Sequence, residues 1–408
     1  MTRAVKVKRR KLNKIILPEQ PSHDVFLDIM SKVFRWSRFL GVVGGASIWW
    51  KLWGAFVVSW LVAIECQAVW KVIKALTGLA ADTTGNRSIT VRFAGTIFYM
   101  GNLIGLILCW RLSSSWVTLA KYWTSMELGL SLKQVPKDRT IKYRMNTVII
   151  VIAIVEHLLN VMVNLETDCT FVECLRRFML KSHGFLFLEH QYKDWYTIPL
   201  LFMSNLATVV WNLQDLLVIL ISMGLSSRYT RLNACNIKIL KLHTWRRIRT
   251  AFVQQATLVR RVNGDLGVLL LASTAFNFYF ICLQLFLGFA HGLSELLLNR
   301  VYYIISFSWL CFRASLAILT AAGVNRLSNA VLLDLYQCSP EFYNVEIERL
   351  QKQLSEECVA LNGLELFYIR RGILLQIAGA VFTYALVLIQ YDTEQNTTNV
   401  PENVTTLA

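Results

Sequence analysis

Charged residues are scarce in this chain of 408 residues. Asp, Glu, Lys and Arg together make up 17% of it, whereas hydrophobic residues make up 55% and the mean hydropathy is +0.45. These values lie outside the range of ordinary soluble domains. They exclude a soluble enzyme or binding module and predict a polytopic membrane protein.

Acidic residues are fewer than basic ones, and the net charge is +16. A charge of this sign is typical of nucleic-acid-binding proteins, but no basic, aromatic-rich soluble module is present. The basic residues instead form clusters between apolar runs, which is the pattern of cytoplasmic loops in membrane proteins. We therefore expect no nucleic-acid partner.

Metal-binding patterns are also absent. The chain has no CxxC pair, and its six histidines are scattered, which argues against a metal site, a cofactor and a histidine-box membrane oxidase. Four of the nine cysteines fall in apolar runs, where a small core residue is the expected role. Cys169 and Cys174 share one polar loop, so they are predicted to form a disulfide if that loop is extracytoplasmic.

Seven apolar runs are long enough to cross a bilayer as helices. They cover residues 48–74, 90–112, 143–164, 196–223, 264–290, 300–325 and 372–391. The basic first residues are not typical of a signal peptide, because the first long apolar run starts after about residue 47. The predicted fold is all-α, a polytopic membrane protein with seven transmembrane helices.

Two independent patterns predict the orientation. With a cytosolic N-terminus, loops 1–47, 111–144, 225–262 and 326–371 are cytoplasmic and hold 31 of the 42 Lys and Arg residues. The three glycosylation sequons then all fall on the outer side, at Asn86, Asn396 and Asn403. Both patterns predict an extracellular C-terminus, which is the reverse of a G-protein-coupled receptor.

The cytoplasmic loops also carry helical patterns. Residues 24–40 form a predicted amphipathic helix, which either lies on the inner membrane surface or packs on cytosolic segments of the same protein. In loop 326–371 a helix is predicted from Pro340, with apolar residues at 343, 347, 350 and 354. This helix and the basic helix 237–262 are expected to form a cytosolic base rather than two solvated helices.

The last apolar run carries a recognisable motif. Phe382-Thr-Tyr-Ala-Leu-Val-Leu-Ile-Gln-Tyr391 resembles the C-terminal signature of insect gustatory receptors, which is Thr-Tyr, five mostly apolar residues, Gln and an aromatic residue. Runs 276–286 and 313–325 are similar to the corresponding stretches of the sugar-receptor branch. The resemblance covers essentially the whole chain, with two departures. Ala385 stands where sugar receptors commonly have Glu, and Tyr391 where Phe is usual.

The resemblance implies a homotetrameric, ligand-gated, non-selective cation channel in the plasma membrane of a sensory neuron, opened by a small tastant, most simply a sugar. Related receptor subunits are further expected partners. The implied domains are an N-terminal tail 1–47, a six-helix ligand-binding domain 48–325 with extensions in 225–262, cytosolic anchor helices 326–371, a pore helix 372–391 and an extracellular tail 392–408. A bitter compound or an internal nutrient is the alternative ligand.

The pore is expected along one face of the last helix. Thr383, Val387 and Gln390 are spaced by four and three residues, so they share a face, and four copies of Gln390 would form a neutral polar ring. Ile389 and Tyr391 would add an apolar constriction. The alternative role for Gln390 is a hydrogen bond to a neighbouring helix instead of a pore lining. Tyr384, on a different face, is expected to pack against the fifth span.

Ligand binding is expected from polar and aromatic residues in the outer halves of the second to sixth spans. These types supply the hydrogen bonds and the stacking faces that sugars need, but each also has a structural role in membrane helices. The candidates are Tyr99, Asn102, His157, Asn160, Asn205, Trp211, Gln284, Tyr303, Ser306 and Trp309.

Four ionisable residues lie within predicted spans, where a charge is costly unless it is paired. They are Glu65, Glu156, Asp215 and Arg313, and Arg313 is predicted to pair with Glu156 or Asp215. A secondary transporter is the alternative class, but internal repeats and helices broken by Gly or Pro are not visible. An enzyme is not expected, since no intramembrane His/Asp/Glu motif has catalytic spacing.

Overall fold

The computed structural model describes residues 25–45, 47–80, 89–130, 155, 170–187, 192–233, 242–290, 297–341 and 343–398. Within them the fold is helical, as predicted, and the single bridge outside helices joins Asn362 to Tyr368. The elements are α2 (Val25–Trp36), η1 (Ser37–Leu40), α3 (Ile48–Leu76), α4 (Ile89–Leu130), α6 (Phe171–Ser182), η5 (Asp194–Tyr196), α7 (Thr197–Asn233), α8 (Leu242–Ala290), α9 (Leu297–Ser328), α10 (Leu332–Tyr336), α11 (Val345–Glu356) and α12 (Gly372–Thr398).

Five described helices are long and apolar enough to cross a membrane, namely α3, α4, α7, α8 and α9. A shorter apolar helix covers Gly372–Val387 within α12, and the predicted span 143–164 lies almost wholly outside the described residues. Helices α4 and α8 run well past the predicted spans 90–112 and 264–290 at one end, because no proline interrupts them there. With 49 residues, α8 is about 70 Å long, far more than the bilayer core requires.

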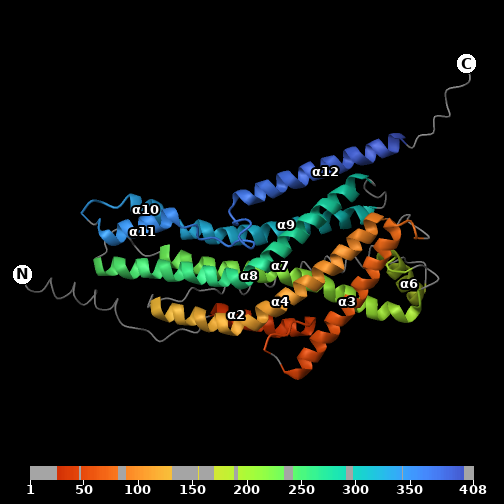
Figure 1. The fold of residues 1–408 in the computed structure, drawn as a ribbon, viewed down its shortest axis with the longest axis horizontal. Coiled ribbons are helices and arrows are strands. Elements are labelled where there is room, and N and C mark those ends of the chain that lie inside the picture. Colours follow the sequence, from red (N-terminus) through yellow and green to blue (C-terminus); the bar gives the residue numbers. More distant parts are fainter. Residues whose placement is uncertain are drawn as a thin grey trace, which may run out of the picture.

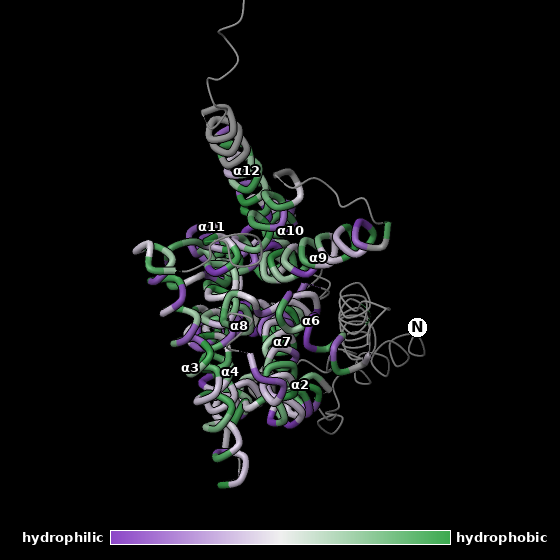
Figure 2. Tube along the Cα trace, turned by 90° about the vertical axis from the view of Figure 1, so that its right-hand side faces the viewer, coloured by the Kyte–Doolittle hydropathy of each residue, from purple (hydrophilic) through white to green (hydrophobic). Residues whose placement is uncertain are grey.

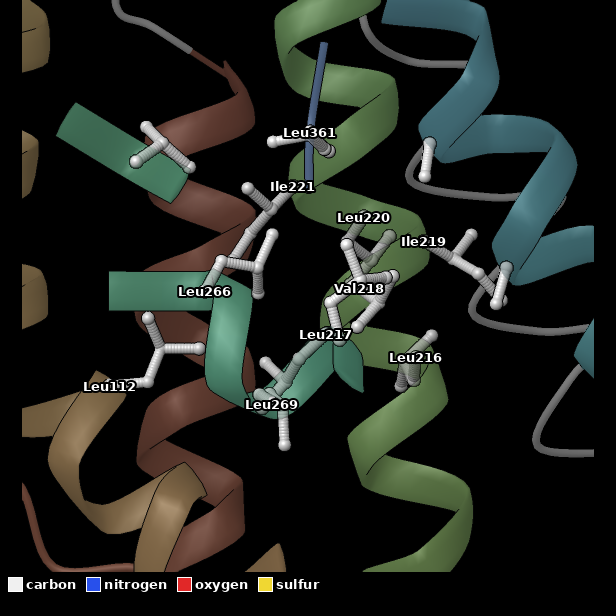
Figure 3. Close-up of a cluster of buried hydrophobic side chains, with 14 of the residues drawn as sticks. Leu112, Leu216, Leu217, Val218, Ile219, Leu220, Ile221, Leu266, Leu269 and Leu361 are labelled. Atoms are coloured by element: carbon white, nitrogen blue, oxygen red, sulfur yellow. The ribbon is translucent and has the colours of Figure 1, made fainter. Parts of the chain in front are cut away.

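Helix α7 is the centre of the bundle. Residues 213–222 are all buried, and since successive side chains turn by about 100°, α7 is covered on every side here. Figure 3 shows residues 216–221 of α7 with Leu112 of α4, Leu266 and Leu269 of α8, and Leu361. Leu361 belongs to the segment that precedes α12, so this segment reaches the core.

Helix α12 lies at the edge of the bundle (Figure 1), and the end-on view in Figure 2 shows it projecting from the other helices. It packs on α8 and, less extensively, on α9. Val381 and Ala385 are buried in this contact, whereas Leu375 and Phe382 are 77% and 66% exposed. Helix α12 continues past the predicted end of the span at 391 to Thr398.

Helix α2 packs on protein, which decides between the two alternatives for residues 24–40. Its apolar side chains Phe26 and Phe34 are buried against Trp116 of α4, and Phe26 also contacts Trp123. The guanidinium of Arg228 on α7 lies 5.0 Å from the Phe26 ring, in a cation–π contact. The apolar face of α2 is therefore covered by α4 and α7.

Helix α11 packs on α8 and on α10, which is the association predicted for the helices of 237–262 and 326–371. Ile347, Leu350 and Leu354 of α11 are buried, as their spacing predicts. Tyr343, predicted for the same face, precedes the helix and is 47% exposed. The helix does not begin near Pro340 as predicted but at Val345. The reason is the cap, because the side-chain oxygen of Asn344 accepts the backbone N–H groups of residues 346 and 347.

Ion pairs add to this base. Arg249 Nε of α8 lies 2.5 Å from Glu346 Oε2 of α11, and Arg260 pairs with Glu357 at 2.9 Å. The hydrogen bond from Arg249 holds the pKa of Glu346 below its usual value. These contacts fix α11 and the residue that follows it to the first half of α8.

Candidate functional site

A buried ion pair joins α7 to α9. Arg313 Nε lies 2.7 Å from Asp215 Oδ2, and the two side chains are 4% and 0% exposed. At a rise of about 1.5 Å per residue, both residues lie about 25 Å from the first residue of their helices, close to the midpoint of each helix. Of the two partners predicted for Arg313, Asp215 is the one in contact, and Glu156 lies outside the described residues.

Helices α8 and α7 both supply hydrogen bonds to this pair. Asn277 Nδ2 donates to both carboxylate oxygens of Asp215, at 3.0 and 3.1 Å, and the Ser273 hydroxyl, one turn away, donates to Oδ1. Arg313 Nη1 donates to Asn212 Oδ1 at 2.5 Å. A buried ion pair is tolerated when its polar atoms are bonded in this way, so the network ties α7, α8 and α9 together.

An aromatic group adjoins the network. The guanidinium of Arg313 lies 4.6 Å from the ring of Trp211, and Trp211 Nε1 donates to Asn277 Oδ1 at 3.1 Å. Phe280 of α8 and Phe98 of α4 surround the same indole, with ring centroids at 4.8 and 6.0 Å. Helix α4 is thereby joined to the three helices that hold the ion pair.

Several buried amide oxygens have no hydrogen-bond partner among the described residues, and Gln214 Oε1, next to Asp215 in the chain, is one of them. Two others lie on the helices that supply Phe98 and Phe280: Asn102 Oδ1 of α4, whose Nδ2 donates to the Phe98 carbonyl, and Gln284 Oε1 of α8. The Tyr303 hydroxyl donates to the backbone carbonyl of Gln284 at 2.8 Å, and a Cβ at Gly288 would lie 2.1 Å from that hydroxyl. The two oxygens are acceptors that a hydroxyl-bearing molecule can satisfy.

The loop 183–187 after α6 is buried against α4. His183 Nε2 is hydrogen-bonded to the Tyr99 hydroxyl at 2.9 Å, and the His183 ring stacks on Phe185. Gly95 of α4 leaves room for Phe185, since a Cβ there would lie 2.6 Å from its ring. Burial lowers the pKa of His183 to about 4 because the charged ring would be poorly solvated.

The structure brings some of the predicted ligand residues together and not others. Tyr99, Asn102 and Trp211 meet around Phe98, and Gln284 bonds Tyr303. Trp309 instead stacks on Phe312, which is 49% exposed, and Asn205 and Ser306 are half-buried. His157 and Asn160 lie outside the described residues, and ligand binding stays a prediction for all ten.

Sequence reasoning missed several residues of this region. Asn277 and Phe280 belong to the run 276–286. Together with Ser273 they have the spacing of one helix face, and this spacing could have identified them. Phe98, His183 and Phe185 carried no such signal, because one apolar ring or one histidine in a loop has no distinguishing pattern.

The predicted pore face of α12 is turned away from the bundle. Thr383 and Gln390 are exposed and Val387 is 54% exposed, whereas Val381 and Ala385 are buried. At about 100° per residue, Thr383, Val387 and Gln390 point roughly opposite to Val381 and Ala385. The side chains of Ile389 and Tyr391 are outside the described part of α12, and Tyr384, 47% exposed, borders the packed face.

The remaining predicted features are the cysteine pair, the glycosylation sequons and Glu65. Cys174 is disulfide-bonded, while the other described cysteines are free; the expected partner, Cys169, lies outside the described residues. Among the sequon residues, Asn396 falls in α12, and Asn86 and Asn403 lie outside the described part. One carboxylate oxygen of Glu65 in α3 is buried without a hydrogen-bond partner in the described chain.

Comparisons with known proteins agree with this architecture. A family model described as "Trehalose receptor" matches residues 24–400. The Drosophila melanogaster gustatory receptor for sugar taste 64a is 28% identical over 318 residues, which are 74% of this chain and 69% of that protein. Gustatory receptor 5a for trehalose, from the same species, is also 28% identical, over 74% of this chain and 70% of its own length.

The fold has a solved counterpart. The insect olfactory receptor OR5 from Machilis hrabei superposes with a TM-score of 0.65 at 13% sequence identity, over 89% of this chain and 97% of that protein. At this identity the similarity concerns the fold alone.

Proposed function

We propose, because this chain belongs to the trehalose receptor family of insect gustatory receptors, that it is a ligand-gated, non-selective cation channel opened by an extracellular sugar. Four copies assemble around a pore lined by α12, in the plasma membrane of a sensory neuron. The bundle of α3, α4, α7, α8 and α9 binds the sugar and holds α12 at its edge.

The face of α12 is the observation that carries the channel proposal. A helix that only anchors a protein in lipid has no use for Thr383 and Gln390 on the side opposite its packing contact. The same polar side chains suit a helix whose free face meets water and the α12 helices of other copies. Gln390 then offers a carbonyl oxygen to a partly hydrated cation at the outer mouth.

The proposed orientation has the N-terminus in the cytosol, seven spans and the C-terminus outside. Figure 1 supports it, since α6 lies at one end of the bundle and α10 and α11 at the other. The disulfide of Cys174 in α6 suits an extracellular, oxidising side. The basic loops and the ion-paired base then lie in the cytosol.

The sugar site is proposed between α4, α7 and α8, on the outer side of the Asp215–Arg313 pair. Sugar hydroxyls donate hydrogen bonds to Asn102 Oδ1 and Gln284 Oε1, and the aromatic rings of Phe98 and Trp211 pack on the C–H face of the sugar. Unbonded buried oxygens are costly, so a polyol that satisfies them gains affinity that a purely apolar molecule does not.

Whole-cell recording from cells that express this chain alone tests the proposal. A panel of sugars, including trehalose, and of bitter compounds is applied, and a cation current evoked by a sugar is the expected result. Current with bitter compounds only would overturn the sugar assignment. Sugar uptake without channel current would overturn the channel.

A further inference from the structure

The segment 357–371 is the covalent link between α11 and the proposed pore helix α12, and it contains a strained turn. Leu364 and Glu365 have φ angles of 53° and 62°, and they are the non-glycine residues with positive φ among the described residues. The left-handed region is unfavourable for residues with a Cβ. Two such residues in succession need support from their surroundings.

The support comes from an amide pair between the turn and α8. Asn263 Nδ2 donates to Asn362 Oδ1 at 2.8 Å, and Asn263 Oδ1 accepts the backbone N–H of Asn362, also at 2.8 Å. Asn362 Oδ1 additionally accepts the backbone N–H of Glu365 at 3.1 Å. Asn362 therefore holds Glu365 in its strained conformation, and Asn263 holds Asn362 against α8.

The backbone of the turn lies directly against α8. A Cβ at Gly267, one turn after Asn263, would lie 3.0 Å from the Asn362 carbonyl oxygen. On both sides of the turn, Leu361 and Ile369 are fully buried, and Figure 3 shows Leu361 within the core cluster around α7. Three residues after Ile369, α12 begins at Gly372.

We infer that Asn263 and Asn362 are positioning residues that couple α8 to the start of α12. The proposed sugar site includes Gln284 of the same α8 helix, so a shift of α8 on sugar binding moves Asn263, the turn and α12 together. The gating consequence rests on the proposed channel function, whereas the positioning of α12 does not. Through the amide pair, a movement of the long α8 helix is transmitted to the proposed pore helix α12.

The positioning is tested by hydrogen exchange on the purified full-length protein, with residues 361–375 as the probe and α11 as the internal reference. In Asn263→Ala and in Asn362→Ala, exchange over 361–375 is expected to be about tenfold faster, with α11 unchanged. The double variant should exchange no faster than either single one, because both substitutions remove the same contact.

Two further variants distinguish loss of the Asn263–Asn362 contact from a general loss of structure. Asn362→Asp keeps an oxygen that accepts from Asn263 Nδ2 and from Glu365 N–H, so wild-type exchange is expected. Adding Leu364→Gly and Glu365→Gly to Asn263→Ala should slow the exchange again, because glycine adopts positive φ without strain. Unchanged exchange in Asn362→Ala, or equal acceleration in Asn362→Asp, would overturn the positioning role.

The coupling is tested by current recording at matched surface expression. The sugar concentration for half-maximal current is expected to rise at least about fivefold in Asn263→Ala and Asn362→Ala. Gln351→Ala is the matched control, since it removes a 2.8 Å side-chain bond to the Leu335 carbonyl within the same cytosolic base. An altered exchange with an unaltered dose response would overturn the coupling. A wild-type protein without any sugar-evoked current would overturn the proposed function while the exchange data still decide the positioning.

Discussion

Helices α7 and α12 are both long apolar helices that carry polar side chains, and they use them in opposite ways. In α7, Asn212 and Asp215 are bonded to partners on α8 and α9, and residues 213–222 are covered on all sides. In α12, Thr383 and Gln390 lie on the face that no other described helix covers, and Thr383 bonds only its own helix, through the Gly379 carbonyl. The polar side chains of α7 thus hold helices of the same chain together, whereas those of α12 are free to contact water or other copies of the chain.

The largest expected effect comes from breaking the α7 side of this comparison. Arg313→Gln leaves Asp215 buried without its counter-charge, which should cost about 3–5 kcal/mol of stability. Little protein is then expected at the cell surface, as measured by surface biotinylation and by size-exclusion chromatography after heating. The control is Asp215→Asn combined with Arg313→Gln, which removes both charges and should recover most of the surface protein. A double variant as poor as the single one would show that the ion pair is not the reason.

The two faces of α12 can be compared with the same substitution. Ala385→Glu places a carboxylate against α8, at the position where sugar receptors commonly carry Glu, and should cost about 3 kcal/mol because the group is buried in an apolar contact. Val387→Glu, on the exposed face, should change stability by less than about 0.5 kcal/mol. Thermal stability in detergent measures both. Equal losses in the two variants would show that the faces are wrongly assigned.

A pH effect is expected at the buried loop 183–187 that follows α6. The pKa of His183 is about 4 in the folded protein and about 6.5 in an unfolded chain. The unfolded state therefore takes up the proton first, so stability is constant above pH of about 6.5 and falls as the pH decreases toward 4. At pH 5 the loss is about 2 kcal/mol, at 1.36 kcal/mol per pH unit.

The measurement is the melting temperature at pH 7.5 and at pH 5. His183→Gln, which does not titrate and keeps a group that can bond Tyr99, should show a smaller difference between the two. An equal difference in the variant would assign the pH effect to other groups.

The smallest effect on stability is expected at Gln390. Gln390→Ala should leave the melting temperature unchanged, since the side chain is exposed, and should change single-channel conductance roughly twofold, since a ring of carbonyl oxygens is lost. A clear loss of stability with unchanged conductance would instead support the alternative in which Gln390 bonds a neighbouring helix.

The helical fold was predictable because long apolar runs admit only one structure in a membrane. For Arg313 the sequence predicted two possible partners, Glu156 and Asp215, since a charge in such a run needs a counter-charge. The start of α11 was not predictable, because the sequence offers two suitable starts. Asn344 is a good N-cap residue and Pro340 is a good first-turn residue. The contribution of Phe98 and of the 183–187 loop was equally hidden, as an apolar ring reveals nothing about its neighbours.

The membrane class, the family resemblance and the polar face of the last helix follow from the sequence alone, because hydropathy and residue spacing are local properties. The tertiary structure alone decided which helix is central, which side of α12 is covered and that Ala385 belongs to the packed side. It alone revealed the Asn263–Asn362 pair, whose members lie 99 residues apart. Such contacts depend on how helices pack in space, and packing between distant segments leaves no periodic signal in one sequence.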